Sequence, residues 1–504
     1  MPIQQMLLGV GAAIKAAMEL RVWQANSGNG TSATMRVPGA RGCFVTFSDG
    51  RVGLIGKGED WADVRSGSGN TSAWMVTSTD TKTIAKTRYL WGSTSQGEPL
   101  AIYPYRGSGT DLTLGIQNGY YYAHSPNRNR PHIVVMDSLS NNMAILKQWK
   151  WEYPNMSSGC QNIEFFTKDG TDDDYWVTMQ DNASGGLSSG NIRIAKMNIT
   201  SSSISISNCR YFGGDSGSMQ IRSSNIDSNE NIYVVGQSEE VSSNNRDWMF
   251  VLKFDTSSGI TWQRNYYIGN GNNYGSGCCE VDSNGNVYSS ALFGGQSWTS
   301  PSNGYKSAIL KHNSSGTLQW AVSWNGMDAF IDGSAMINDK LYILVRYRPD
   351  SYNWSVIRPI IAEIDTSDGS IEWQNIVTWS DDRWEVKHNN NHGGSLKAQG
   401  NDLAFTWRFF KDRDGSSLIY NYGTAFATGI KSNGDVGDGT IGSLMTYAST
   451  NLMTLTDCSS DFTTTTTEFS DGTFNTGTVT DNTSNSEFNT AHTPNQTLTN
   501  MNDQ

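Results

Sequence analysis

The carboxylates of this chain are its first candidates for chemistry, because a hydrolase or a lyase needs a positioned acid and a positioned base. Most of them stand in short turns beside Asn, Ser and Gly, where the hydrogen bonds of an Asx turn account for them. The clearest cases are Asp227, Asp255, Asp282 and Asp365. The sequence also identifies no set of arginines of the kind that binds an acidic sugar. It therefore predicts a protein that is not an enzyme and has no catalytic residue.

The sequence also gives little support for a metal site or a cofactor site. His388 and His392 have the i, i+4 spacing that binds a metal on a helix, but three Asn residues separate them and Gly393-Gly394 follows, which indicates a loop. Gly-rich stretches such as residues 269–273 are not followed by the Gly-Lys-Ser/Thr of a phosphate loop. We therefore expect no metal site and no cofactor.

Aromatic side chains between the apolar runs are better candidates for binding. Aromatic rings stack on sugar faces and anchor protein interfaces, while Asn and Asp side chains pair with hydroxyl groups. The four candidates are Trp298, Tyr352, Trp354 and Trp384. Packing within the loop is the alternative for each of them.

The elements that must position these residues are indicated by a repeat. Seven copies of one pattern run through residues 43 to 436, and the clearest begin at Asp227-Ser228-Asn229 and Asp282-Ser283-Asn284. In each clear copy a short strand precedes a second strand that ends in Lys, then a Ser/Gly turn, then a Trp. The aligned positions are Tyr121, Trp176, Tyr233, Tyr288 and Tyr342, with spacings of 55, 57, 55 and 54 residues. A period of this length predicts a repeat architecture.

Each repeat is expected to form one antiparallel blade. The apolar runs are short, rich in Val, Ile, Tyr and Phe, and bounded by Asn-Gly, Asp-Gly or Ser-Gly turns, as in strands joined by hairpins. A four-stranded blade uses about 40 to 55 residues, and a ring of blades protects their edges. The sequence thus predicts an all-β, seven-bladed β-propeller over residues 40–440, with six or eight blades as alternatives and the recurring Trp between adjacent blades.

Two segments resemble the blade-docking motif of quinoprotein-like propellers: Asp255-x-x-x-Gly259-x-x-Trp262 and Asp365-x-x-x-Gly369-x-x-x-Trp373. The resemblance implies that the last strand of a blade is wedged on the next blade by this Trp. The Thr-Gly of that motif is replaced here by Ser258-Gly259 and by Asp368-Gly369, and no cofactor-binding pattern accompanies it.

The first thirty residues differ from the repeats and are expected to form a separate leader. Apolar residues recur at helical spacing over residues 2–21, which predicts a short amphipathic helix whose apolar stripe needs a partner. The anchoring positions are Ile3, Met6, Leu7, Val10, Ile14 and Met18. Packing of the leader on the chain's own propeller is the alternative.

The run from Met1 to Ala12 resembles the N-terminal leader of structural proteins of marine tailed phages, the cyanophages and pelagiphages. The resemblance covers only these dozen residues. It implies a virion protein, assembled in the host cytoplasm, whose residues 1–21 bind other tail or capsid proteins. It also implies several copies per particle, which would strengthen weak contacts with a host glycan or protein.

Residues 441–504 form an acidic C-terminal extension rich in Thr, Ser and Asn. Thr or Ser alternates with apolar residues, which favours strands, and no Lys or Arg follows Lys431. We expect the first part to close the ring by pairing with the blade near residue 45. The remainder is expected to form an extra β-layer or an ordered arm, with disorder as the alternative.

Composition excludes several classes of function. The chain has 504 residues, 52 of them Gly, and a net charge of −12, which argues against binding nucleic acid through its phosphates. No apolar run is long enough to span a membrane, and the start lacks a secretory signal pattern. The six cysteines have no disulfide or zinc spacing, so reduced core thiols are expected, with adjacent Cys278 and Cys279 on opposite faces of a strand.

Three functional hypotheses remain from the sequence. The leading one is a phage virion structural protein, a tail-associated fibre or adhesin in which the leader anchors an outward propeller for host attachment. The second is a propeller enzyme that degrades polysaccharide, which predicts charged residues converging at one end of the channel. The third is a scaffold propeller, either cellular or decorating a capsid.

Overall fold

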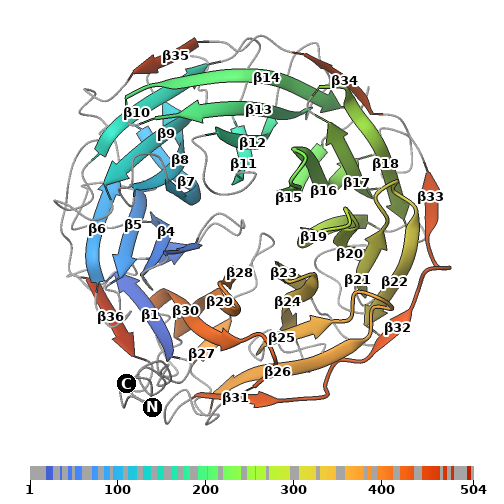
Figure 1. Ribbon diagram of the computed structural model, residues 1–504. Coiled ribbons are helices and arrows are strands. Elements are labelled where there is room, and N and C mark those ends of the chain that lie inside the picture. Colours follow the sequence, from blue (N-terminus) through green and yellow to red (C-terminus); the bar gives the residue numbers. More distant parts are fainter. Residues whose placement is uncertain are drawn as a thin grey trace, which may run out of the picture.

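The chain forms a ring of antiparallel sheets around a central axis, as the computed structural model shows (Figure 1). Its described part contains strands, turns and bends but no helix, and no helix there is long and apolar enough to cross a membrane. The structure describes residues 19–25, 34–36, 44–47, 51–59, 71–77, 84–90, 95–105, 112–121, 129–137, 145–152, 160–166, 174–181, 191–200, 202–213, 219–239, 247–255, 257–267, 272–295, 306–324, 330–347, 358–379, 384–386, 394–411, 421–435, 445–465, 469–473, 478–481 and 496–500. The six anchoring residues of the leader lie outside these segments.

Five sheets share one plan: four consecutive antiparallel strands and a fifth strand from the C-terminal extension. Short runs rich in Val, Ile and aromatic residues, separated by Asn, Asp and Gly turns, favour this plan. The four-stranded blades are β7 (Ser95–Tyr105), β8 (Leu112–Tyr121), β9 (Asn129–Asp137), β10 (Ile145–Glu152); β11 (Cys160–Phe166), β12 (Asp174–Asp181), β13 (Asn191–Ile199), β14 (Ile204–Gly213); β15 (Met219–Ile226), β16 (Asn231–Glu239), β17 (Asp247–Asp255), β18 (Gly259–Tyr267); β19 (Asn272–Val281), β20 (Val287–Gly295), β21 (Lys306–His312), β22 (Leu318–Trp324); and β23 (Phe330–Ile337), β24 (Lys340–Tyr347), β25 (Arg358–Ile364), β26 (Ile371–Trp379).

An eleven-stranded sheet completes the ring. It holds two antiparallel groups joined by β2 (Thr34–Arg36), which pairs with β4 on one side and with β30 on the other. The first group is β3 (Phe44–Thr46), β4 (Val52–Glu59), β5 (Thr71–Thr77) and β6 (Ile84–Leu90). The second is β28 (Gly394–Gln399), β29 (Asp402–Lys411), β30 (Asn421–Lys431) and β1 (Glu19–Ala25), with the short β27 (Trp384–Val386) at an edge. The all-β propeller prediction is confirmed, whereas seven blades stays a prediction because the two groups share one sheet.

The ring is closed by the N-terminal strand, which corrects two predictions. Strand β1 pairs with β30 from Glu19 to Gln24, so the end of the expected helix is a blade strand. The expected closure by the C-terminal extension is wrong, because Met445–Ser449 pairs with β26 instead of the blade near residue 45. A strand from the other end of the chain satisfies the edge that the last blade would otherwise expose.

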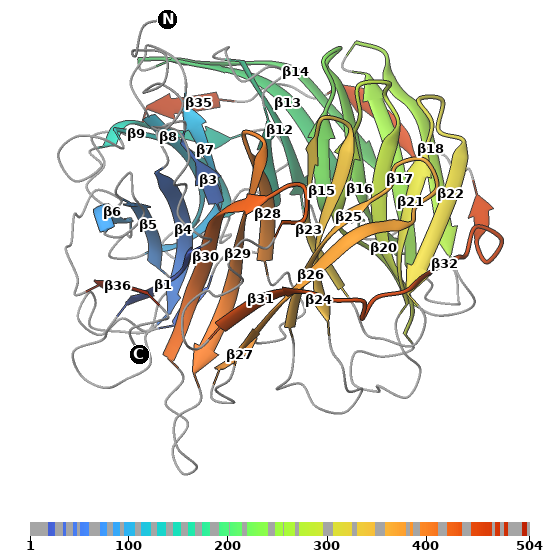
Figure 2. The same cartoon turned by 60° about the horizontal axis from the view of Figure 1, so that its bottom comes forward.

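The C-terminal extension forms a belt around the outside of the blades, visible as the outermost strands in Figures 1 and 2. We call the stretch of chain from strand β31 to strand β36 the belt. Its strands pair in turn with β26, β22, β18, β14, β10 and β1, so the belt runs back around the ring against the order of the blades. The six strands are β31 (Met445–Ser449), β32 (Leu455–Asp457), β33 (Thr463–Thr465), β34 (Ser470–Thr473), β35 (Thr478–Asp481) and β36 (Gln496–Asn500). The expectation of strands is confirmed, but they widen existing sheets and do not form a separate layer.

Strand register confirms most of the repeat alignment. Trp176, Tyr233, Tyr288 and Tyr342 all face the same position of the third strand, occupied by Lys196, Lys253, Lys311 and Glu363. Tyr121 does not belong with them. The aligned residue faces the third-strand residue that lies two positions before the Asp at the end of that strand. Tyr233 does so by facing Lys253, two positions before Asp255. In the blade of Tyr121 the residue that does so is Leu114, which faces Val135, two positions before Asp137. With Leu114 in place of Tyr121, the interval before Trp176 is 62 residues (114 to 176) instead of 55.

The recurring Trp lies between adjacent blades, as the sequence predicts. Trp262, Trp320 and Trp373 each cover the turn glycine of the following blade, namely Gly316, Gly369 and Gly434. The Trp262 and Trp320 indole N–H groups donate to Ser314 O at 3.1 Å and to Thr366 O at 3.3 Å on that turn. A buried Trp exchanged for Ala costs about 3–5 kcal/mol, so these contacts are a large part of blade docking.

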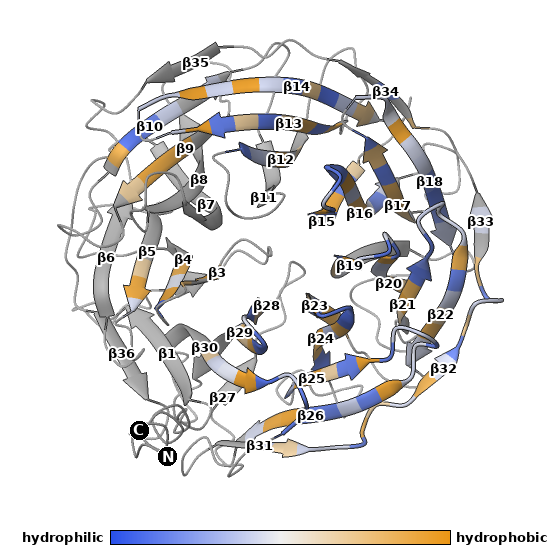
Figure 3. Cartoon of the chain, in the orientation of Figure 1, coloured by the Kyte–Doolittle hydropathy of each residue, from blue (hydrophilic) through white to orange (hydrophobic). Residues whose placement is uncertain are grey.

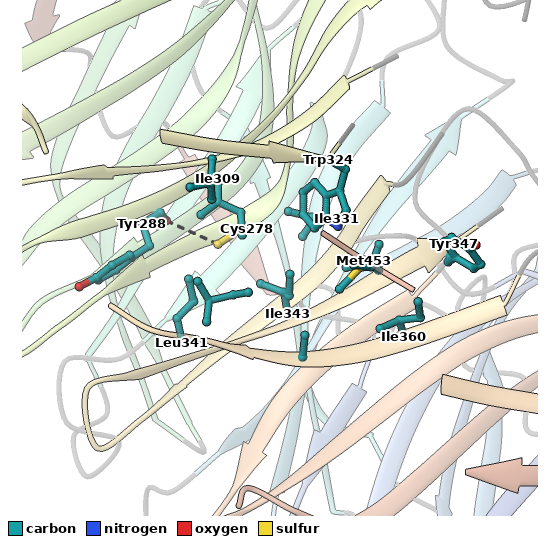
Figure 4. Close-up of a cluster of buried hydrophobic side chains, with 14 of the residues drawn as sticks. Cys278, Tyr288, Ile309, Trp324, Ile331, Leu341, Ile343, Tyr347, Ile360 and Met453 are labelled. Carbon is teal, nitrogen blue, oxygen red and sulfur yellow. Dashed lines mark hydrogen bonds between the residues drawn. The ribbon is translucent and has the colours of Figure 1, made fainter. Parts of the chain in front are cut away.

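Apolar cores lie between neighbouring blades instead of at one central point. Figure 3 shows apolar and polar residues alternating along the strands, and Figure 4 shows one such core, with Cys278, Tyr288 and Met453 among its members. Cys278 belongs to this core and Cys279 to the next one, so the adjacent cysteines do face opposite sides. Four cysteines whose side chains the structure describes are buried free thiols, as expected: Cys209, Cys278, Cys279 and Cys458.

Candidate functional site

Irregular strands surround the axis of the ring. The pairing of the first and second strands shifts register in five blades, within β7, β11, β15, β19 and β23. These first strands are the innermost of their blades (Figure 1). A bulge leaves one residue without a ladder partner and turns its side chain, which is why bulges recur beside functional sites.

The bulge in β23 places a buried carboxylate beside a buried arginine. Asp332 is the extra residue between Ile331 and Gly333, and its Oδ2 lies 2.7 Å from Arg346 Nε on β24. Only 1% and 6% of the two side chains are exposed. The Arg346 guanidinium lies 4.8 Å from the centre of the Phe330 ring, and its Nη1 has no hydrogen-bond partner among the residues that the structure describes. An arginine held in this way presents a fixed positive charge, because the guanidinium does not lose its proton in proteins.

The bulge in β15 carries a second arginine at the same level of the ring. Arg222 is the extra residue, and its Nε and Nη2 donate to Gln237 Oε1 at 3.1 Å and 2.8 Å. Gln237 and Arg346 are equivalent, since each follows its aligned Tyr by four residues. Two blades thus use the same device, in which a bulged inner residue binds the second strand. We call Arg222, Gln237, Asp332 and Arg346 the axial site.

Strand β19 lies between the two pairs and fixes their spacing. Glu280 accepts hydrogen bonds from Asn225 Nδ2 on β15 at 3.1 Å and from Ser334 Oγ on β23 at 2.8 Å. The backbone carbonyl of Asp332 lies against Gly277, where a Cβ would not fit. A buried carboxylate with both oxygens satisfied is a structural tie, and it holds three inner strands together.

The axial site lies at the end of the ring where first strands begin and second strands end. Asp332 is the third residue of β23, and Arg346 is the last but one of β24. Strands β20 and β24 also end at this end of the ring. The residues that follow them in sequence, 296–305 and 348–357, contain Trp298, Tyr352 and Trp354 and lie outside the described residues. Trp384 begins β27 and pairs with Lys411 of β29.

None of the four axial residues was predicted from the sequence. A signal exists, because Asp332 interrupts the apolar run Phe330-Ile331 and Arg346 interrupts the run from Leu341 to Val345. A charge within a run that reads as a fully buried strand needs a partner. Without the register shift, however, the sequence does not place those two charges side by side.

The turn carboxylates are structural, as predicted. Asp282 accepts hydrogen bonds from Asn284 N, Asn286 N, Asn286 Nδ2 and the Tyr288 hydroxyl, and Asp227 repeats this pattern with Tyr233. Burial, reinforced by the Asp282 carboxylate, raises the pKa of Tyr288. A hydrogen bond from the Ser257 hydroxyl holds the pKa of Asp255 below its usual range. Among the described residues no group of three His, Cys, Asp or Glu is placed to bind a metal, and His388 and His392 lie outside them.

Comparison with known proteins describes the fold only. No family model and no curated protein matches the chain. Similar solved structures include the endosialidase of phage phi92, at 10% identity and a TM-score of 0.39 over 82% of this chain and 70% of that one. A polysaccharide lyase, an ulvan lyase of family PL25, has 8% identity and a TM-score of 0.43 over 80% and 93%. The NanB sialidase of Streptococcus pneumoniae has 11% identity and a TM-score of 0.38 over 86% and 73%.

The prediction that the chain is not an enzyme is corrected at this point. The solved structures of similar fold are named as a glycosidase of phage origin, a sialidase and a polysaccharide lyase. The sequence argument excluded catalysis because the visible carboxylates stand in turns. The structure adds a carboxylate that does not, since Asp332 stands beside Arg346 near the axis.

Proposed function

We propose that the chain binds and cleaves an anionic polysaccharide at the axial site. The observation that carries this proposal is the buried Asp332–Arg346 pair on a bulged inner strand, with Arg222 on the next inner strand but one. Arginines bind carboxylate and sulfate groups through paired N–H donors. Because the two arginines lie two blades apart, each would bind a different acidic group of a polysaccharide that carries its charges at intervals.

The arrangement assigns different roles to the charged residues. Arg222 is partly exposed and belongs to the surface that meets the ligand. Arg346 adds a buried positive charge beneath the surface of the axial site, because Asp332 and the Phe330 ring hold its guanidinium in place. Asp332 is the candidate to exchange a proton with the sugar, which requires that ligand binding opens its ion pair with Arg346, because only 1% of the Asp332 side chain is exposed. Glu280 is occupied by its two hydrogen bonds. Trp298, Tyr352 and Trp354 follow in sequence the strands β20 and β24, which end at this same end, and aromatic rings of this kind stack on sugars.

Binding of acidic and neutral polysaccharides by the full chain tests the proposal, with Arg222→Gln as the main variant. Loss of one charged hydrogen-bond donor costs about 1.5–3 kcal/mol, so we expect binding of an acidic polysaccharide to weaken roughly tenfold or more. The control is Arg264→Gln on the outer strand β18, which we expect to leave binding unchanged. Equal effects of the two variants, or equal binding of neutral chains, would reject the axial site.

Cleavage of the polysaccharide is measured on the same samples by assaying its products. Hydrolysis releases new reducing ends and elimination releases unsaturated sugars, and Asp332→Asn is expected to abolish either product while the chain still folds and binds. Binding without any product from a panel of acidic polysaccharides would contradict the catalytic half of the proposal.

We also propose a place for the chain in a phage particle, as a tail-associated component assembled in the host cytoplasm. The resemblance of residues 1–12 to phage leaders supports it, and so does the belt, which protects blade edges in a protein exposed to its surroundings. The partners would be tail or capsid proteins, bound through the part of the leader that precedes strand β1, residues 1–18. Gold-labelled antibody on purified virions, with a chain lacking residues 1–18, tests this: label at the tail that is lost with the leader is expected, and unlabelled particles would reject it.

A further inference from the structure

The junction between blades β11–β14 and β15–β18 lacks the Trp found at the next three junctions. Where Lys253 faces Trp262 and Lys311 faces Trp320, Lys196 faces Ser207. Ser207 is exposed. The blade β15–β18 nevertheless keeps the docking glycine, Gly259, whose φ of +98° matches the positive φ of Gly316, Gly369 and Gly434. A docking surface is therefore present without the indole that covers it elsewhere.

The belt fills this place. A Cβ built on Gly259 would meet the Asp471 carboxylate first and Arg210 Nη1 next, whereas at the other three glycines the same test meets Trp262, Trp320 with Val322, and Trp373. Asp471 belongs to β34, which pairs with β14 so that Asp471 faces Phe212 and Thr473 faces Arg210. The position held by a blade residue at three junctions is held here by a belt residue.

Arginine 210 connects the belt to the following blade. Its Nη1 lies 3.2 Å from Asp471 Oδ2, and its Nη2 donates to the backbone carbonyl of Ser257, on the turn that leads to Gly259. The side chains of Arg210 and Asp471 are only 18% and 30% exposed. The contacts of Arg210 with Asp471 and with Ser257 thus connect the belt, the blade β11–β14 and the blade β15–β18. In the same way the Trp262 indole connects two blades by its hydrogen bond to Ser314 O.

We infer that Asp471 is a docking residue that replaces the absent Trp, so that this junction is held by the belt as well as by its own blades. The inference concerns ring closure and does not depend on the polysaccharide proposal. It also explains why a belt with no positive charge meets an arginine at this position, since Arg210 fixes the belt register at blade β11–β14 by pairing with one carboxylate.

The test compares Asp471→Asn with Asp461→Asn in the full chain. Asp461 is an exposed belt residue, so its substitution makes the same change of charge and size outside the junction. Hydrogen–deuterium exchange should become roughly five- to tenfold faster in β14, β34 and residues 257–259 of Asp471→Asn, and stay unchanged around β33. Equal exchange in the two variants would overturn the inference.

A rescue separates a docking role from a local loss of charge. Ser207→Trp supplies an indole at the position of Trp262 and Trp320. Combined with Asp471→Gly, which removes the side chain that occupies this place, it should return exchange in residues 257–259 to the original rate. A double variant that folds and still exchanges as fast as Asp471→Gly alone would show that the carboxylate does not stand in for a Trp. Failure of the double variant to fold would count against it as well, since the docking surface at Gly259 would then not accept the indole.

Discussion

Individual buried side chains show that the blade cores are built for one protonation state. His312 is fully buried at 0% exposure, its Nε2 lies 2.6 Å from the Tyr266 hydroxyl, and its ring stacks on Trp262 at 6.0 Å. Burial, with a smaller contribution from the nearby Arg264 charge, lowers the pKa of His312 to about 3. Between about pH 3 and its ordinary pKa of about 6.5, the His312 ring is thus neutral in the folded chain and charged in the unfolded one.

We predict that His312 makes the chain less stable in acid. The unfolded histidine binds a proton below its ordinary pKa of about 6.5, whereas the folded one does so only near 3, so the free energy of unfolding falls as the pH falls between these values. Urea unfolding at several pH values measures how steeply the free energy of unfolding changes with pH. His312→Gln should reduce this slope by up to the amount that corresponds to one bound proton. Identical slopes in the two proteins would show that the buried ring is not the cause.

At the scale of elements, three blades are docked by a glycine that lies under a Trp, and the contributions of the glycine and of the Trp can be separated. We predict that Gly369→Ala destabilises the fold by about 1–3 kcal/mol, since its φ is +82° and a Cβ would approach Val322 Cγ1 to 2.9 Å and Trp320 to 3.1 Å. Gly400→Ala is the control, because its φ is +63° and nothing lies within 4 Å. Urea unfolding should give a cost near 1 kcal/mol for the control. An equal cost at both positions would mean that docking on Trp320 contributes nothing.

The same elements show what could be predicted from the sequence and what could not. The repeat predicted the ring, the strand order and the Trp contacts because those strands are long enough for an apolar pattern to be visible. The belt strands were not placed, because segments such as Leu455–Asp457 and Thr463–Thr465 have three residues each and derive their position from partners more than one hundred residues away. Other parts of the belt are bound by Gln263, which accepts from Phe469 N, and by Gln374, which donates to Met453 O. Each Gln directly follows a docking Trp, a pattern that is visible only once the belt is known.

The axial site escaped prediction for a related reason. Asp332 and Arg346 lie side by side only because one extra residue in β23 shifts the register. Sequence alternation predicts which face a residue occupies in a regular strand, and a bulge changes that face for the residue it inserts. The turn carboxylates could be assigned because their hydrogen bonds are local, whereas the axial charges meet across two strands.

For the molecule as a whole, the belt changes what holds the ring together. Both ends of the chain meet on one blade, where β36 pairs with β1, and between β31 and that point the belt crosses from blade to blade. Along the way it adds one or more side chains to each of four cores, namely Tyr447, Met453, Cys458 with Phe462, and Phe469. A ring closed only by neighbouring blades could open at its weakest junction, whereas this ring must also release its belt.

The belt should therefore contribute to stability through its buried anchors and little through its exposed residues. Met453 is 3% exposed, and its backbone exchanges two hydrogen bonds of 2.9 Å with the Gln374 side chain. We predict that Met453→Ala lowers the free energy of unfolding by about 2–5 kcal/mol, as removal of a core side chain does. The adjacent Leu452 is 39% exposed, so Leu452→Ala is a matched control expected to stay within about 0.5 kcal/mol. Urea unfolding followed by Trp fluorescence measures both, because Trp320 and Trp324 share the core with Met453. If Met453→Ala behaved like Leu452→Ala, the belt would be a covering on a ring that is already stable, and blade docking alone would have to account for closure.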